Sequence, residues 1–282
     1  MTTDLTSTPS HVGPRPHRPY LTHARPLFFA HRGGSGVAPE NTLEAFARGL
    51  SLGAAAIETD IQQTRDGAIV VMHDASVDRT TNGTGPVSGF TLDELRRLDA
   101  GYRFTPDGGQ TFPFRGQGVT IPTLRAAFER FPDVRFNIDL KQSSPARERA
   151  LWTLIQQLDA RDRVLVASGE AHASIVRFRQ LSAGQVATSA SEREIRGFFG
   201  ATLARATRWL HPAYDALQVP PSYRGIRVVS RPFVTAAHRL GLAVHVWTVD
   251  TAATTERLLA LGVDGIMTDR PDLLAPVFAA RQ

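Results

Sequence analysis

Ionisable residues occupy alternate positions in two short apolar runs of the sequence, "AAIETDI" and "RFNIDLK". Glu58 and Asp60 lie in the first run, and Asp139 and Lys141 lie in the second. If both runs are buried strands, each presents its charged side chains on one side, because residues two apart on a strand share a face. Isolated buried carboxylates are costly, so three that converge need a cation. Mg²⁺ or Ca²⁺, which take oxygen ligands, suit this set better than zinc.

The basic residues of the sequence differ in type at one informative position. Lys141 is the only lysine among the 32 lysine and arginine residues. A compact ammonium fits a confined site beside a metal ion, where a forked guanidinium would need more room. Arg32 could add a bidentate contact to an anionic substrate, and His31 and His73 each close an apolar run. Together, two imidazoles, a metal ion and the basic side chains of Lys141 and Arg32 are the groups that phosphoryl transfer with a histidine acid/base pair requires.

Short apolar runs alternate with helix-period segments from residue 27 to the end of the sequence. This alternation predicts βαβ units and a parallel sheet. Eight such units in roughly 250 residues favour an α/β fold of the (β/α)8 (TIM) barrel type. A doubly wound sheet is less well supported, because its nucleotide-binding fingerprint is absent from the sequence. In a barrel, the chemical site would lie at the carboxyl ends of the strands.

The predicted organisation is a single barrel domain over residues 27–282. Residues 1–26 are rich in Pro, Thr, Ser and His, and we predict that they form a disordered leader. After the third apolar run, "AIVVMHD", the sequence becomes polar and rich in glycine from about residue 75 to residue 120. Insertions of this length in a barrel usually cover the site or form a small subdomain, and we expect a cap.

Composition excludes several classes of protein. The absence of cysteine excludes disulfides and thiolate metal sites. The net charge of +5 is not clustered in any basic stretch, which argues against nucleic-acid binding. No run approaches 18 consecutive apolar residues, so we expect a soluble, cytoplasmic protein without a transmembrane segment. We expect a small-molecule partner, and the sequence leaves the oligomeric state open.

Two long motifs resemble a known family. "FFAHRGGSGVAPENTLEAFARGLSLGAAAIETDIQQTRDGAIVVMHDASVDRTTNGTG" is similar to the opening signature of the glycerophosphodiester phosphodiesterases, and "VWTVD" with "LGVDGIMTDRPDLL" resembles the closing one. The resemblance covers about residues 27–276. It implies a TIM barrel with a cap inserted after the second histidine. It also implies hydrolysis, with a bound divalent cation, of a glycerol phosphodiester such as glycerophosphocholine or glycerophosphoethanolamine to glycerol 3-phosphate and an alcohol.

The resemblance also implies roles for individual residues. His31 and His73 match the two catalytic histidines, one removing a proton from the nucleophile and the other protonating the leaving alcohol, in an order that is left open. Arg32 and Lys141 match positions that contact the phosphate. Trp247 matches an aromatic residue of the substrate pocket.

The metal-binding set departs from the family at one position. Glu58 and Asp60 match two metal-binding carboxylates, whereas the third position, usually Glu, is Asp139 here. The side chain is one methylene shorter, so the ion would sit closer to this strand or be reached through water. Related sphingomyelinase and phospholipase D barrels are similar in having Asp there, and that relation keeps lysophospholipids open as substrates.

Other interpretations of these residues remain open from the sequence. Lys141 and Asp139 could form a structural ion pair, and Trp247 could belong to the core. His245, two residues before Trp247, is expected to have a packing role. The whole chain could act as a lysophospholipase D, or as a catalytically silent barrel that binds a phosphate or lipid ligand.

Overall fold

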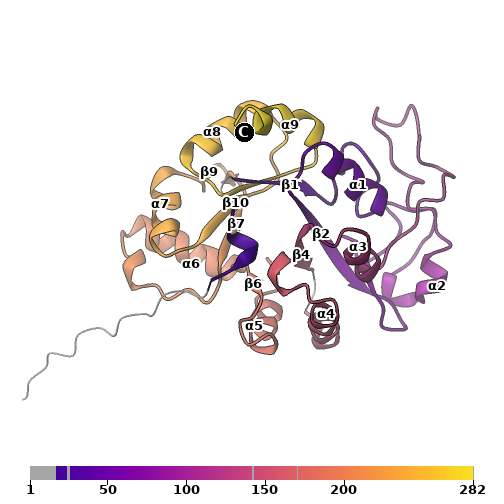
Figure 1. Ribbon diagram of the computed structural model, residues 1–282, viewed down its shortest axis with the longest axis horizontal. Coiled ribbons are helices and arrows are strands. Elements are labelled where there is room, and N and C mark those ends of the chain that lie inside the picture. Colours follow the sequence, from indigo (N-terminus) through magenta and orange to yellow (C-terminus); the bar gives the residue numbers. More distant parts are fainter. Residues whose placement is uncertain (1–16, 24–25, 142, 170, 282) are drawn as a thin grey trace, which may run out of the picture.

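The computed structural model describes residues 17–23, 26–141, 143–169 and 171–281. Within them, eight parallel strands surround a common axis (Figure 1). Neighbouring strands pair in the order β6, β5, β4, β2, β1, β11, β10, β7, and a bridge between Ser189 and Ala216 joins the two ends of that order. The predicted (β/α)8 fold is therefore confirmed. The barrel strands are β1 (Leu27–His31), β2 (Ala56–Gln63), β4 (Arg135–Leu140), β5 (Val164–Ala167), β6 (Ala187–Thr188), β7 (Ala216–Val219), β10 (Ala243–Val246) and β11 (Gly265–Thr268).

Helices cover the outside of the barrel (Figure 1). Most begin at a Ser or Thr whose side-chain oxygen accepts a hydrogen bond from a backbone N–H in the first turn, as Thr42 does from Ala45. Such caps stabilise a helix by about 1 kcal/mol each. The helices are α1 (Leu43–Ser51), α3 (Leu124–Arg130), α4 (Pro145–Gln157), α5 (His172–Leu181), α6 (Glu192–Leu203), α7 (Arg231–Arg239), α8 (Ala252–Leu261) and α9 (Pro271–Ala279), with 3-10 turns η3 (Arg161–Arg163) and η4 (Thr207–Trp209).

The alternation predicted for β4 is observed. Phe136, Ile138 and Leu140 are buried in the layer between the barrel and the helices. Asn137 and Asp139 alternate with them and line a cavity at the carboxyl end of the barrel. The apolar side of the strand therefore holds the helices in place, while its polar side is free for chemistry.

The third apolar run is not a barrel strand. It forms β3 (Ile69–Val71), which pairs antiparallel with the end of β2. The connection between the two strands is only a few residues long, and a parallel neighbour would need a crossover of about a dozen residues or more. β3 runs back along the end of β2 toward the barrel. His73, two residues after β3, therefore lies at the cavity at the carboxyl end of the barrel.

The insertion after His73 has its own small core. Val77, Val87, Leu95 and Val119 are buried against one another and against β3. The segment contains η2 (Val87–Gly89) and α2 (Leu92–Leu95), and Figure 1 shows α2 at the flank of the barrel, on the side of α1 and α3. The insertion is therefore stabilised by a hydrophobic cluster of its own.

The predicted leader ends too late in the sequence. Residues 1–16 and 24–25 lie outside the described residues, but residues 17–23 pack against the barrel. Tyr20, in η1 (Pro19–Leu21), is 1% exposed and belongs to the cluster inside the barrel. Arg135 donates a hydrogen bond to the Tyr20 carbonyl at 3.1 Å, and Arg18 pairs with Asp215 at 3.1 Å. Composition predicted disorder over residues 1–26 because Tyr20 is the only Phe, Trp or Tyr among them.

No helix in the described part of the chain is long and apolar enough to cross a membrane.

Candidate active site

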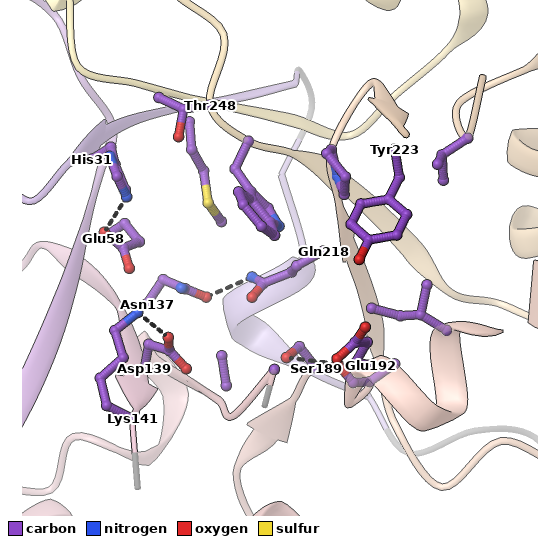
Figure 2. Close-up of a pocket in the computed structure, with 18 of the residues that line it drawn as sticks. His31, Glu58, Asn137, Asp139, Lys141, Ser189, Glu192, Gln218, Tyr223 and Thr248 are labelled. Carbon is purple, nitrogen blue, oxygen red and sulfur yellow. Dashed lines mark hydrogen bonds and ion pairs between the residues drawn. The ribbon is translucent and has the colours of Figure 1, made fainter. Parts of the chain in front are cut away.

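A cavity of about 610 Å³ opens at the carboxyl ends of the barrel strands. Seven of the eight residues singled out from the sequence line it, as Figure 2 shows for those that it labels. Asp60, the eighth, is completely buried beside it. The lining seven are His31, Arg32, Glu58, His73, Asp139, Lys141 and Trp247.

Strand register brings these residues to one level. His31 at the end of β1 is opposite Glu58 on β2, and Asp60 is opposite Asp139 on β4. Lys141 follows β4 by one residue and shares the inward face of Asp139. Charged groups far apart in the sequence therefore meet because the three strands are neighbours in the barrel.

Lys141 lies between two carboxylates. Its Nζ atom is 2.6 Å from Asp139 Oδ2 and 2.9 Å from Asp60 Oδ1. Burial alone would lower the pKa of Lys141, but the negative charges of Asp139 and Asp60 outweigh burial and raise it. Burial would likewise raise the pKa of Asp60, yet Lys141 and other nearby positive charges hold it below its ordinary value. The lone lysine is therefore ionised and paired with both strands.

Glu58 has a different environment. It is 5% exposed, and burial together with the neighbouring Asp60 raises the pKa of its carboxyl to about 7. The backbone N–H of Arg32 donates to Glu58 Oε2 at 3.1 Å, and His31 Nε2 is 3.6 Å from the same oxygen. Burial and Asp60 therefore disfavour the ionised form of Glu58 more than His31 and Lys141 favour it.

The expected convergence of Glu58, Asp60 and Asp139 on one point is not formed. Among the described residues, no group of three or more His, Cys, Asp or Glu side chains is arranged to hold a metal ion. The physical reason is the Lys141 ammonium, which occupies the position between Asp60 and Asp139. The donor set nevertheless fits a hard cation. Asp139 Oδ1 is buried without a hydrogen-bond partner in the described part of the chain, and Glu58 is an incompletely compensated carboxyl.

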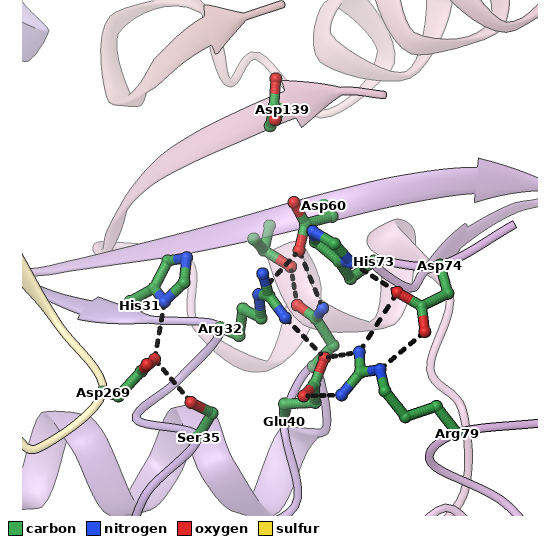
Figure 3. A network of polar contacts seen from close by, with 12 residues as sticks. His31, Arg32, Ser35, Glu40, Asp60, His73, Asp74, Arg79, Asp139 and Asp269 are labelled. Carbon is green, nitrogen blue, oxygen red and sulfur yellow. Dashed lines mark hydrogen bonds and ion pairs between the residues drawn. The ribbon is translucent and has the colours of Figure 1, made fainter. Parts of the chain in front are cut away.

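Each of the two histidines is bonded to an aspartate. His31 Nδ1 is 2.6 Å from Asp269 Oδ1, which also accepts a hydrogen bond from Ser35 Oγ at 2.5 Å (Figure 3). Although burial would lower the pKa of His31, Glu58 and Asp269 raise it. Asp269 was not predicted from the sequence. It follows β11 in "MTDRP". Its signal in the sequence was an ionisable residue at the end of an apolar run, the same signal that identified His31.

His73 belongs to a chain of ion pairs. Its Nδ1 atom is 2.6 Å from Asp74 Oδ1, and Asp74 accepts from Arg79 Nε at 2.7 Å. Arg79 also donates to both oxygens of Glu40 at 2.7 Å, and Glu40 accepts from Arg32 at 3.1 Å (Figure 3). Sequence reasoning missed Asp74, Arg79 and Glu40. The network therefore connects the imidazole of His73 to the guanidinium of Arg32, and both residues line the cavity.

The insertion reaches the site through Arg79. Among the described residues of segment 75–120, none lines the cavity. Arg79 holds Asp74 and Glu40, which lie behind the lining residues.

Two further lining features complete the cavity. Gln218 Nε2 donates to Asn137 Oδ1 at 2.6 Å and is 3.3 Å from Nδ1 of His245. His245 is fully buried, and burial lowers its pKa to about 4, so it is neutral and packs as expected. Trp247 is 42% exposed and is therefore not a core residue.

The sequence of this chain is similar to those of known proteins. The family model described as the glycerophosphoryl diester phosphodiesterase family matches residues 31–273. A glycerophosphodiester phosphodiesterase from Caldanaerobacter subterraneus is 38% identical over 255 residues, which cover 88% of this chain and 96% of the relative.

Solved structures share the barrel. A glycerophosphoryl diester phosphodiesterase domain from Mycobacterium tuberculosis has a TM-score of 0.77 at 21% identity, covering 92% of this chain and all of that chain, which shows a common fold. An Oleispira antarctica phosphodiesterase, solved in complex with the product sn-glycerol-3-phosphate, has a TM-score of 0.72 at 25% identity, covering 91% of this chain and 97% of that chain. The chain belongs to the glycerophosphoryl diester phosphodiesterase family and is a phosphoric diester hydrolase.

Proposed function

We propose that this enzyme hydrolyses glycerophosphodiesters such as glycerophosphocholine or glycerophosphoethanolamine to glycerol 3-phosphate and an alcohol, with a bound divalent cation and with His31 and His73 as the acid/base pair. The observation that carries the proposal is the placement of two imidazoles, each bonded to an aspartate, in the same cavity as Lys141 and Arg32. The Oleispira antarctica relative, solved with sn-glycerol-3-phosphate, supports the choice of product.

The aspartates define which imidazole atom would move a proton. With Nδ1 of His31 bonded to Asp269 and Nδ1 of His73 bonded to Asp74, the Nε2 atom of each ring is left for proton transfer. A carboxylate at Nδ1 fixes the tautomer and the orientation of the ring. One histidine would accept the proton of the nucleophile, and the other would protonate the leaving alcohol.

Glu58, Asp60 and Asp139 would hold Mg²⁺ or Ca²⁺. Both ions prefer carboxylate oxygens, and Asp139 keeps a buried oxygen without a hydrogen-bond partner among the described residues. When bound, the ion supplies positive charge that stabilises the phosphoryl oxygens in the transition state. Lys141 and Arg32 would bind the same phosphate as ammonium and guanidinium donors. Trp247 would contact the organic part of the substrate.

Arg79→Ala is expected to lower kcat for glycerophosphocholine by roughly 10- to 100-fold, with a smaller change in KM. The reason is that Arg79 fixes Asp74, which orients His73, and such supporting partners have effects of about this size. Arg79→Lys should recover only part of the loss, because an ammonium cannot reproduce the forked contacts to Glu40 and Asp74. The measurement is steady-state kinetics of the two variants.

A matched control is Arg65→Ala. Arg65, in the connection between β2 and β3, pairs with Glu94 of the insertion at 3.1 Å, and it lies outside the cavity lining. That variant should behave as the parent enzyme. Parental kcat in Arg79→Ala would show that the insertion does not support the site.

The test of the proposed function is release of glycerol 3-phosphate from glycerophosphocholine, measured with and without a chelator.

A further inference from the structure

Two amide side chains of the cavity lining have no part in the proposed acid/base chemistry. Asn137 on β4 and Gln218 on β7 are bonded to each other, with Gln218 Nε2 donating to Asn137 Oδ1 at 2.6 Å (Figure 2). β5 and β6 lie between these two strands in the barrel. The hydrogen bond therefore crosses the barrel interior, and we call the two residues the amide pair.

The amide pair lies below the charged groups of the site. Asn137 is opposite Leu165, a member of the hydrophobic cluster inside the barrel, and Asp139 lies two residues further toward the carboxyl end of the strand. Two strand residues span about 7 Å, and alternate residues share a face. The pair is therefore about one layer of side chains deeper than Asp139 and Lys141, where the cavity meets the apolar interior.

The stability of the barrel does not require two amides at this depth. Asn137 is 2% exposed and Gln218 is 8% exposed. Burial of an amide costs free energy unless its polar atoms are hydrogen-bonded. Replacing both partners of a buried hydrogen bond by apolar groups of the same shape is nearly neutral. An apolar floor would therefore serve the fold equally well.

A neighbouring histidine fixes the orientation of the pair. Gln218 Nε2 is also 3.3 Å from Nδ1 of His245, and burial lowers the pKa of His245 to about 4, which keeps its ring neutral. A neutral imidazole has one nitrogen that accepts a hydrogen bond. The two N–H groups of the Gln218 amide are thereby occupied, one by Asn137 and one by His245.

The amide pair leaves one acceptor and one donor for a ligand. Gln218 Oε1 and Asn137 Nδ2 have no hydrogen-bond partner among the described residues. Unlike Asp139 Oδ1, neither atom is fully buried, so both are open to the cavity. Turning both amides over would exchange the two roles and leave the same complement. One acceptor and one donor match a hydroxyl group, which both donates and accepts.

We propose that the amide pair binds the terminal hydroxyl of the substrate's glycerol arm and so selects glycerol diesters over diesters of simpler alcohols. This inference rests on the proposed function. Of the two arms of glycerophosphocholine, only the glycerol arm carries hydroxyls, and its terminal hydroxyl is the one further from phosphorus. With the phosphate at Lys141 and Arg32, the glycerol arm extends inward, and its terminal hydroxyl donates to Gln218 Oε1 and accepts from Asn137 Nδ2.

The experiment compares kcat/KM for glycerophosphocholine with kcat/KM for 2-hydroxypropyl phosphocholine, which lacks only the terminal hydroxyl. The analogue keeps the hydroxyl next to the phosphodiester and the same leaving group, so any part that these groups play in the reaction is unchanged. The parent enzyme should prefer glycerophosphocholine by about 10²-fold, because the analogue leaves both amides of the pair without a partner.

Two variants assign this preference to the pair. Gln218→Met removes the amide at similar side-chain length and should reduce the preference to about tenfold or less, because it lowers kcat/KM for glycerophosphocholine more than for the analogue. Asn137→Leu should act in the same way from the other strand. The matched control is Gln63→Met on β2, whose amide donates to the Gly67 carbonyl at 3.2 Å outside the cavity lining. Its preference should equal that of the parent.

The possible failures are distinguishable. Equal losses for both substrates in Gln218→Met and Asn137→Leu would show that the pair only supports the barrel, and would overturn this inference while leaving the proposed function intact. A parent enzyme without the preference would have the same meaning. Absence of glycerophosphocholine hydrolysis by the parent would overturn the proposed function itself, and this inference with it.

Thermal unfolding shows whether the two variants fold. If neither does, inhibition of the parent enzyme decides, with glycerol 3-phosphate compared with 2-hydroxypropyl phosphate as competitive inhibitors. Glycerol 3-phosphate should bind about tenfold more tightly or better, because it alone carries the terminal hydroxyl. Equal inhibition by the two compounds would contradict the inference.

Discussion

Replacing His31 or His73 by alanine is expected to lower turnover of glycerophosphocholine by about 10²-fold or more in each case. Each ring is bonded at Nδ1 to an aspartate and lines the cavity, so removal of the ring removes a proton-transfer group. Neither residue belongs to the proposed metal ligands. Metal titration should therefore give the parental affinity in both variants, while steady-state kinetics shows the loss.

A third histidine provides the control for this pair. His238 is also bonded to an aspartate, with Nε2 at 2.8 Å from Asp264, but it lies outside the cavity lining. His238→Ala should keep parental turnover. If His31→Ala or His73→Ala also kept it, the assignment of two catalytic histidines would be wrong.

Lys141→Arg is the second change with a large expected effect, a loss of about 10²- to 10³-fold in kcat/KM, which is typical for a displaced transition-state donor. The variant keeps the positive charge but replaces a compact ammonium by a planar fork. Lys141 Nζ lies within 2.9 Å of both Asp60 and Asp139, so the larger group cannot occupy the same position without moving one carboxylate. Steady-state kinetics measures the loss.

Thermal unfolding separates this effect from a failure to fold. Because the charge that compensates Asp60 and Asp139 is retained, the unfolding temperature of Lys141→Arg should stay near that of the parent. Lys141→Ala should unfold at a lower temperature, since it removes from the buried Asp60 the positive charge that lies 2.9 Å away. Parental kinetics in Lys141→Arg would mean that the choice of lysine has no functional basis.

The fold was predictable because its determinants are local and repeated. On β4, the alternation of Phe136, Ile138 and Leu140 with polar residues predicts both the strand and the face that points into the barrel. The error at residues 69–71 has a similar origin. A short apolar run has the same appearance in a parallel barrel strand and in an antiparallel return strand, and only the short connection to β2 distinguishes them.

Type and spacing singled out His31, Arg32, Glu58, His73, Asp139 and Lys141 among the residues that line the cavity, and the resemblance added Trp247, but the partners of these residues were not predicted. Asp269 is 238 positions from His31 in the sequence, and the two meet because β1 and β11 are neighbours in the barrel. Arg79 lies in the insertion, outside any helix or strand, and does not line the cavity, so no helix or strand periodicity in the sequence indicates its role. Pairwise geometry also decided the position of Lys141, which separates two carboxylates that the pattern alone would bring together.

The most direct test of the central claim is glycerol 3-phosphate release from glycerophosphocholine by the full chain, with Mg²⁺ or Ca²⁺, then with EDTA, then with the metal restored. The account predicts turnover with metal, loss of turnover on chelation and recovery on addition of the metal. Turnover that persists in excess EDTA would contradict the proposed role of Glu58, Asp60 and Asp139. Absence of turnover under all three conditions would contradict the proposed glycerophosphodiester substrate.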